Sequence, residues 1–252
     1  MVTLTAADFA DTGQWRLLLK ISPVALEAFL ENTLHPDLEP QPLCKAQWEL
    51  NRDEMRNNIE NAVYNNPRLL DDFATKIILY DPCTLFIPTD LAEEYLGAEE
   101  DIFRKVYTAE PADIMTDSDG DLTAAWAMAP GLKSFLMRSF PGARISCNLL
   151  DKVRELRKTN DGLSLFAIAR KGEVDIILLN NKELYSASTH EWQHPDDIAY
   201  LVFNLLEVYE KPIEDTALTV DGLPAATDAW KYLASKAGNF INKNIYNENN
   251  QW

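Results

Sequence analysis

The chain is poor in positive charge. Its 252 residues hold 23 lysines and arginines against 40 aspartates and glutamates, which gives a formal net charge of −17 and a pI near 4.5. So acidic a surface repels phosphate backbones, and we expect no nucleic acid partner without a local basic patch. The densest basic group is typical of a solvated helix face with cations near its end: Lys152, Arg154, Arg157 and Lys158.

Cysteine is scarce, and long apolar runs are missing. The three cysteines, Cys44, Cys83 and Cys147, are odd in number and have no paired spacing, which fits a reducing compartment and argues against a zinc ribbon. No apolar run approaches the roughly 18 residues that a membrane span needs. Residues 1–13 are polar and lack the design of a secretion signal. We therefore expect a cytoplasmic protein with no membrane insertion.

The common phosphate-binding and hydrolase motifs are also missing. The sequence has no GxxxxGK[ST] loop, no GxGxxG turn and no GxSxG elbow, and it holds only three histidines. Asp117, Asp119 and Asp121 are spaced like calcium ligands, but Leu122 and Met128 stand where an EF-hand needs glycine and glutamate. A hairpin turn is the better interpretation of that stretch.

One motif could hold a metal ion. A zinc-peptidase pattern is present in the run His190-Glu191-Trp192-Gln193-His194. The chemistry requires both histidines on one continuous helix, one turn apart. Pro195 disfavours helical backbone at His194, and the residues before His190 are strand-like. We favour a strand-to-helix corner in which His194 caps the helix, and a zinc-dependent hydrolase remains a remote alternative.

A strand-strand-strand-helix-strand order occurs within residues 162–222. Apolar runs separated by turn residues predict strands, Pro195 predicts a helix start, and the final strand precedes Asp221-Gly222. The predicted strands are Leu163–Ala169, Val174–Leu179, Leu184–His190 and Thr216–Val220. The helix is apolar on nearly every face, which predicts burial on more than one side. We expect its aromatic residues in the core: Tyr200, Phe203 and Tyr209.

The first part of the chain repeats that order. Strands are predicted at Trp15–Ile21, Leu26–Leu30, Leu43–Leu50 and Thr75–Tyr80, with a helix over Asn51–Asn65. Asn51 and Glu54 have the spacing of a capping box. Two copies of the unit indicate an internal duplication. We therefore predict an α/β protein with mixed sheets and two lobes, residues 14–140 and residues 141–252.

Further elements fill the rest of the chain. Turn residues and apolar periodicity predict strands at Thr84–Ile87, Asp113–Thr116, Leu122–Met128 and Arg144–Cys147. They predict helices at Asp90–Leu96, around Ala98–Glu110, from Pro130 to Phe140, from Asn148 onward and at Ala225–Phe240.

Two such units in tandem are the hallmark of the actin-like ATPase fold, built from paired ribonuclease H-like halves. Three stretches, Tyr80–Pro88, Trp126–Phe140 and Pro195–Leu205, resemble an uncharacterised bacterial family of unknown function with this fold. The resemblance covers residues 14–222 in organisation. Distant structural relatives of that family include actin-like pilus-assembly and secretion proteins.

The resemblance also implies where a nucleotide would bind. In working members of the superfamily, one hairpin turn in each half cradles phosphate with an aspartate-x-glycine pair, and a glycine-rich turn holds the adenosine. The corresponding turns here are Lys20-Ile21-Ser22-Pro23-Val24, Arg170-Lys171-Gly172-Glu173 and Asp221-Gly222-Leu223-Pro224. The first has neither aspartate nor glycine, the second has arginine in place of aspartate, and the third has one glycine. Such turns neither approach phosphate closely nor hold Mg²⁺.

We therefore expect a non-catalytic actin-like binding or scaffold protein with a degraded nucleotide site. Its partner would be another protein, bound at the interlobe cleft or at a sheet edge. The alternative is a weak binder of nucleotides or small molecules in that cleft, through Lys171, Gly172, Asp221 and Gly222. We expect no catalytic residue, metal or cofactor.

Overall fold

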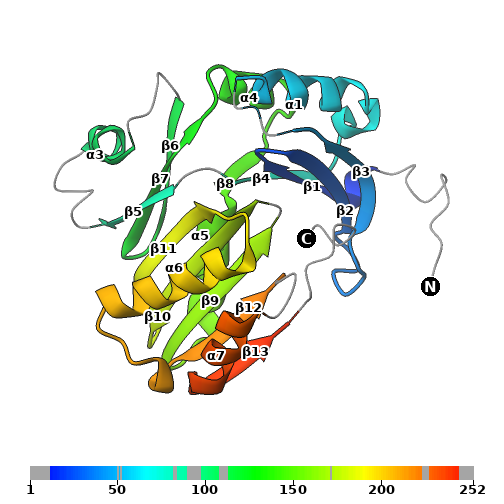
Figure 1. The fold of residues 1–252 in the computed structure, drawn as a ribbon. Coiled ribbons are helices and arrows are strands. Elements are labelled where there is room, and N and C mark those ends of the chain that lie inside the picture. The colour runs from blue at the N-terminus through cyan, green and yellow to red at the C-terminus, as the bar shows by residue number, and fades with distance from the viewer. Residues whose placement is uncertain are drawn as a thin grey trace. The chain divides into compact units, whose positions relative to one another are not determined.

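The computed structural model describes residues 12–49, 51, 53–81, 84–89, 98–107, 113–170, 172–222 and 227–243. The chain separates into two compact units, Met1–Asn148 (unit 1) and Leu149–Trp252 (unit 2). Each unit is built on a mixed five-stranded sheet (Figure 1).

The sheet of unit 1 has the strand order β3-β2-β1-β4-β8. Its strands are β1 (Trp15–Ser22), β2 (Ala25–Asn32), β3 (Gln41–Gln47), β4 (Thr75–Tyr80) and β8 (Arg144–Cys147). The first three pair antiparallel, and β4 lies parallel to both β1 and β8. The predicted lobe boundary after residue 140 lies before β8, whereas strand pairing groups β8 with unit 1.

The sheet of unit 2 repeats this topology in the order β11-β10-β9-β12-β13. Its strands are β9 (Leu163–Arg170), β10 (Glu173–Asn180), β11 (Glu183–Glu191), β12 (Ala217–Asp221) and β13 (Asn239–Asn242). Again the first three pair antiparallel and the last two join in parallel. The two matching sheets confirm the predicted fold class and its internal duplication.

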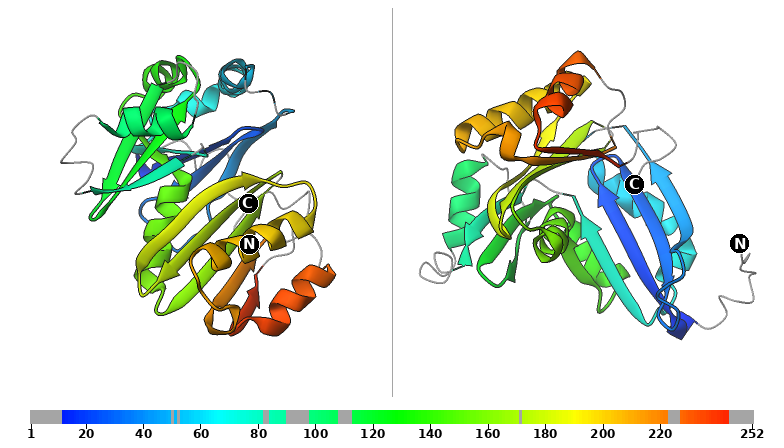
Figure 2. Two further views of the ribbon diagram at one scale, coloured as in Figure 1. Left: turned by 60° about the vertical axis from the view of Figure 1, so that its left-hand side comes forward. Right: turned by 90° about the horizontal axis from the view of Figure 1, so that it is seen from below.

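Helices cover both faces of the unit 2 sheet. In Figures 1 and 2, α6 (Pro195–Val208) and α7 (Asp228–Lys236) lie on one face, and α5 (Asn148–Thr159) lies on the other. The core under α6 and α7 is apolar and includes Val174, Ile176 and Val202. Trp230 on α7 is buried there and donates its indole N–H to the Pro195 carbonyl at 2.9 Å, which joins the two helices.

A smaller sheet in unit 1 has no counterpart in unit 2 among the described residues. Its order is β5-β7-β6, formed by β5 (Thr84–Pro88), β6 (Asp113–Asp119) and β7 (Leu122–Met128), and α3 (Ala98–Val106) contacts β7. The sequence predicts a hairpin turn over Asp117–Asp121, and the structure has a shorter one: β6 continues to Asp119, and Gly120, at a φ of +62°, and Asp121 make the turn. The predicted helix at Asp90–Leu96 lies outside the described residues.

The remaining elements are α1 (Met55–Tyr64), α4 (Leu132–Ser139) and the 3-10 turns at Thr12–Gln14, Pro67–Leu70 and Ile213–Asp215. The predicted capping box of α1 is wrong. Glu54 occupies the cap position without a side-chain bond, and the Asn51 carboxamide accepts the N–H of Asp53 at 3.1 Å instead. This local turn competes with a cap because asparagine bonds readily to backbone two residues ahead.

Two further predictions for unit 2 are wrong. The predicted helix Ala225–Phe240 ends earlier, since Gly238 donates to the carbonyls of Ile213 and Thr216, and the following residues pair with β12 as β13. The aromatic ring of Tyr200 on α6 lies outside the core, with 68% of the residue exposed. Helix α6 buries Ile198, Val202 and Leu206 against the sheet but leaves its outer side to solvent, so its apolar residues are not all buried.

Candidate functional site

The turns at which the resemblance predicts a nucleotide site lie at the carboxyl ends of parallel strands in each sheet. Pro23 and Val24 form the β1–β2 turn, between the paired residues Ser22 and Ala25. In unit 2, Gly172 lies in the β9–β10 turn, between the paired residues Arg170 and Glu173. Lys171 and the segment after Gly222 lie outside the described residues.

Three of the predicted binding residues, Gly172, Asp221 and Gly222, lie at the same edge of the unit 2 sheet. Asp221 ends β12, whose neighbour β9 ends at Arg170. Gly172 and Gly222 both have left-handed backbone, with φ of +74° and +78°. A Cβ on Gly222 would collide with the Ala169 carbonyl oxygen of β9, so only glycine fits there. The structure therefore places the glycines of the two turns close to the end of β9.

The β1–β2 turn offers few backbone donors for a phosphate. Pro23 has no N–H, and the Val24 N–H donates to the Ser22 hydroxyl at 3.3 Å. Trp48, the residue after β3, donates its backbone N–H to the Val24 carbonyl at 2.9 Å and its indole N–H to the Pro23 carbonyl at 2.8 Å. The turn is thus held by bonds within unit 1.

The β9–β10 turn is held in the same way by Trp192, the residue after β11. Its backbone N–H donates to the Gly172 carbonyl at 3.0 Å. Its indole N–H reaches the carbonyls of Arg170 and Glu173, at 2.9 and 2.8 Å. We call each of these arrangements, at Trp48 and at Trp192, a tryptophan clasp. Sequence reasoning missed both, although a tryptophan directly follows the third strand in each half.

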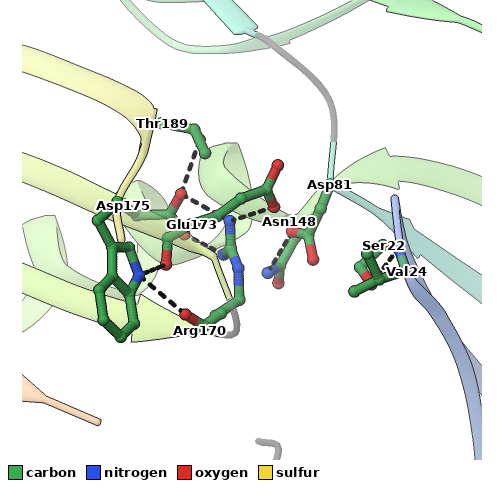
Figure 3. A network of polar contacts seen from close by, with 9 residues as sticks. Ser22, Val24, Asp81, Asn148, Arg170, Glu173, Asp175 and Thr189 are labelled. Carbon is green, nitrogen blue, oxygen red and sulfur yellow. Dashed lines mark hydrogen bonds and ion pairs between the residues drawn. The ribbon is translucent and has the colours of Figure 1, made fainter. Parts of the chain in front are cut away.

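Arg170 stands where the resemblance expects an aspartate, and its charge is neutralised internally. The guanidinium makes two bonds to the Asp175 carboxylate on β10, and Asp175 also accepts the Thr189 hydroxyl at 2.7 Å (Figure 3). The side chains of Arg170 and Asp175 are 9% and 1% exposed. If either partner of such a deeply buried pair is removed, the remaining charge is buried without compensation, which strongly destabilises the protein.

Asp175 has a counterpart in unit 1. It is the third residue of β10, and Glu27 is the third residue of β2. Glu27 is also buried, and its carboxylate contacts the ammonium of Lys45 on β3 at 2.7 Å. Each sheet therefore carries one buried acid at the same place in its second strand, paired with a basic side chain from a neighbouring strand.

A separate buried pair lies at the carboxyl edge of the unit 1 sheet. Asn148, after β8, donates its amide to the Asp81 carboxylate, after β4, at 2.7 Å (Figure 3). The Asp81 N–H donates to the Ile21 carbonyl at 2.9 Å, and both side chains are buried. Sequence reasoning missed this pair. The available signal was a polar residue directly after each of two parallel strands, where α/β sheets bind ligands.

The histidine motif lies on the predicted strand-to-helix corner. His190 is in β11, and its Nε2 lies 2.8 Å from the Ser188 hydroxyl. His194 is the N-cap of α6: its ring accepts the Asp196 N–H, and Asp197 accepts the His194 N–H at 2.8 Å. The backbone N–H groups of His194 and Gln193 donate to the Asp197 carboxylate and lower its pKa. Burial lowers the pKa of His190. Among the described residues, no cluster of histidine, cysteine and carboxylate side chains could hold a metal ion.

Comparisons with known proteins agree with this architecture. The chain is similar to a Bacteroides thetaiotaomicron protein with an actin-like ATPase fold and unknown function, at 17% identity and a TM-score of 0.81, over 94% of this chain and 93% of that one. It is also similar to a chain of the PilM-PilN type IV pilus biogenesis complex, at 11% identity and a TM-score of 0.53, over 91% and 88% of the chains. No curated protein matches the sequence.

The described helices include none that is long and apolar enough to cross a membrane. Residues 7–222 match the family described as "Protein of unknown function (DUF3822)". With that match and the two duplicated sheets, the chain belongs to the DUF3822 family and has the actin-like ATPase fold.

Proposed function

We propose that this protein is a non-catalytic actin-like binding or scaffold protein whose nucleotide-site turns have become structural. The observation that carries the proposal is the internal bonding of both turns. In unit 1 the turn has a proline and a valine N–H already bonded to Ser22. In unit 2 the Arg170 guanidinium is paired with the buried Asp175 carboxylate. A phosphate would have to displace these bonds before it gained any of its own.

Electrostatics supports the same proposal. Two carboxylates, Glu173 and Asp175, lie within ion-pair distance of Arg170, so the positive charge of this arginine is already compensated within the protein. The whole chain carries a net charge of −17. A nucleotide triphosphate would meet repulsion here, and the described residues hold no cluster of metal ligands that would offset it.

We infer that the partner is another protein and that binding takes place in the cytoplasm. The name of one structural relative describes a complex of two proteins, PilM and PilN, in pilus biogenesis. The scarcity of cysteine fits a reducing compartment. The acidic surface disfavours nucleic acid.

A weak nucleotide binder is the second candidate. The observation that favours it is the pair of left-handed glycines, Gly172 and Gly222, close to the end of β9, because glycine allows a ligand to approach the backbone closely. In that case Lys171 and Asp221, which directly precede the two glycines in the sequence, would be the polar side chains that contact the ligand.

Thermal unfolding with and without millimolar Mg-ATP separates the two candidates. A ligand at about 100 times its dissociation constant stabilises the folded state by about 2.7 kcal/mol, which is a visible shift. We expect no shift for the wild-type protein. A shift that disappears in Gly172→Val would overturn the proposal in favour of nucleotide binding. Metal analysis of the same sample tests the zinc hydrolase: stoichiometric zinc that is lost in His190→Ala would support it.

A further inference from the structure

The outer edge of the unit 2 sheet is formed by β11. In the described residues this strand is paired on one side only, with β10. It is nine residues long, and its side chains from Leu184 to His190 are half-buried. The sequence of β11 holds neither proline nor lysine nor arginine. Proline and lysine are the residues with which natural sheets usually protect an exposed edge.

The equivalent edge in unit 1 is built differently. Its strand β3 is shorter and contains Pro42, which has no N–H, and Lys45, which is bound to Glu27. Both are features that discourage pairing with a further strand. The two sheets share one topology, so the contrast between their edges does not follow from the fold.

The backbone groups of β11 that point away from β10 can be assigned. Trp192 donates its N–H to Gly172 of the β9–β10 turn, so its backbone faces β10. In an antiparallel pair the direction alternates from residue to residue. Pairing runs without a shift from Glu191 back to Ser186. Ser188 and His190 therefore face β10, whereas Ala187 and Thr189 present their N–H and C=O groups outward.

The charges on β11 indicate which strand would pair there. Glu183 and Glu191 stand at its two ends, and the residues between them carry no permanent charge. Antiparallel pairing of two copies centred on Ala187 would set Glu183 against Glu191 at both ends, and each copy has a net charge of −17. Like charges directly opposite each other destabilise a strand pair. A segment with a cation near each end would instead be attracted.

We propose that the β11 edge binds an extended segment of another protein by strand addition, and that this segment has lysine or arginine near both ends. The proposal rests on the protein-binding function proposed above and names the surface and the chemistry of the partner. Backbone bonds to Ala187 and Thr189 supply the affinity, and the two glutamates select the charge pattern. Nine residues of strand span about 30 Å, which sets the spacing of the cations.

Fluorescence anisotropy with a synthetic peptide tests the proposal. The probe is Lys-Val-Thr-Val-Thr-Val-Thr-Val-Lys, and its two controls are the same peptide with glutamate at both ends and the same peptide with alternate backbone nitrogens methylated. We expect the lysine peptide to bind and both controls to fail. The methylated control keeps the charge, so it separates strand addition from general attraction to an acidic protein.

Variants at one position locate the binding. Ala187→Pro removes one outward N–H, whereas Ala187→Ser keeps it. We expect Ala187→Pro to weaken binding at least about tenfold and Ala187→Ser to match the wild type, with equal thermal stability as the check on folding. Equal binding by both variants, no binding of the lysine peptide to wild type, or a wild-type dimer that Ala187→Pro dissociates would each overturn the proposal. None of these results bears on Mg-ATP binding, which tests the proposed function separately.

Discussion

Trp48 and Trp192 occupy the same position in the two sheets. Each is the residue directly after the third strand, and each donates its backbone N–H and its indole N–H to carbonyls of the turn between the first two strands. The two halves of the chain barely align residue by residue, yet this contact occurs in both. It ties the third strand of each sheet to the turn between the first two strands.

Removing the indole donor should destabilise each unit. We expect Trp192→Phe to lower the free energy of unfolding by about 1–3 kcal/mol, because two carbonyls lose a donor that is partly shielded from water. Trp48→Phe should cost less, since its indole serves one carbonyl. Urea denaturation measures both. Tyr200→Phe is the control: its exposed ring predicts a change within about 0.5 kcal/mol. Equal stability of all three variants would show that the clasps contribute nothing.

The buried pair of Arg170 and Asp175 should respond to single and double substitution in opposite ways. Arg170→Met leaves a carboxylate uncompensated and should cost about 3–5 kcal/mol. Arg170→Met combined with Asp175→Leu should recover much of that loss, since no buried charge remains. Chemical denaturation of both variants and of Asp175→Leu alone gives the coupling energy. Additive losses in the double variant would mean that the two side chains act independently.

Gly222 should tolerate alanine less well than another glycine with the same backbone. Gly142 has a φ of +75° and no atom within 4 Å of where a Cβ would lie, so Gly142→Ala carries only the left-handed backbone penalty of about 1–2 kcal/mol. Gly222→Ala has that penalty and a collision with the Ala169 carbonyl. We expect a clearly larger drop in melting temperature for Gly222→Ala. Similar drops would show that the backbone at Gly222 shifts enough to relieve the collision.

Stability should fall in mild acid because of His190. Burial lowers the pKa of its ring below 6.5 in the folded state, while the nearby charge of Asp175 acts in the opposite direction. The unfolded chain then binds more protons between the folded pKa and 6.5, so stability increases with pH across that window and is lost as pH falls through it. Urea denaturation at pH 5 and pH 8 should show the difference, and His190→Gln should reduce it. An unchanged slope in the variant would assign the effect to other groups.

Asp197 should change the pH dependence of stability at a lower pH than His190 does. Backbone bonds from His194 and Gln193 lower its pKa below 3.8, so its contribution is present above that value and is lost as pH falls through the folded pKa. Asp197→Asn should flatten the acid end of the stability profile between pH 5 and pH 2. Asp72→Asn, at an exposed carboxylate outside any helix cap, is the matched control. A profile that is the same for wild type and Asp197→Asn would mean that the cap does not stabilise the carboxylate.

Local sequence patterns predicted most of the secondary structure. The strand over Thr75–Tyr80 and the cap at His194 follow from residues that are adjacent in sequence: a compact apolar run in the first case, and histidine, proline and two aspartates in the second. Repetition of one element order then indicated two matching sheets, since strands that recur in the same order pair in the same way. Two of the errors arose where distant residues decided the outcome. The short strand β13 exists because β12 offers it a partner, and Tyr200 is exposed because α6 meets the sheet on one side only.

In the candidate site, too, some features follow from the sequence alone and others depend on contacts between distant residues. The sequence by itself determined that the β1–β2 turn has neither aspartate nor glycine and that the β9–β10 turn begins with an arginine, because the identity of a residue limits what its backbone and side chain can bind. Only the tertiary structure decided what replaced them. Trp48 lies 25 residues from the carbonyl its indole reaches, and Asn148 lies 67 residues from Asp81. Such contacts depend on strand register and on which side chains turn inward, and these are set when the sheet assembles.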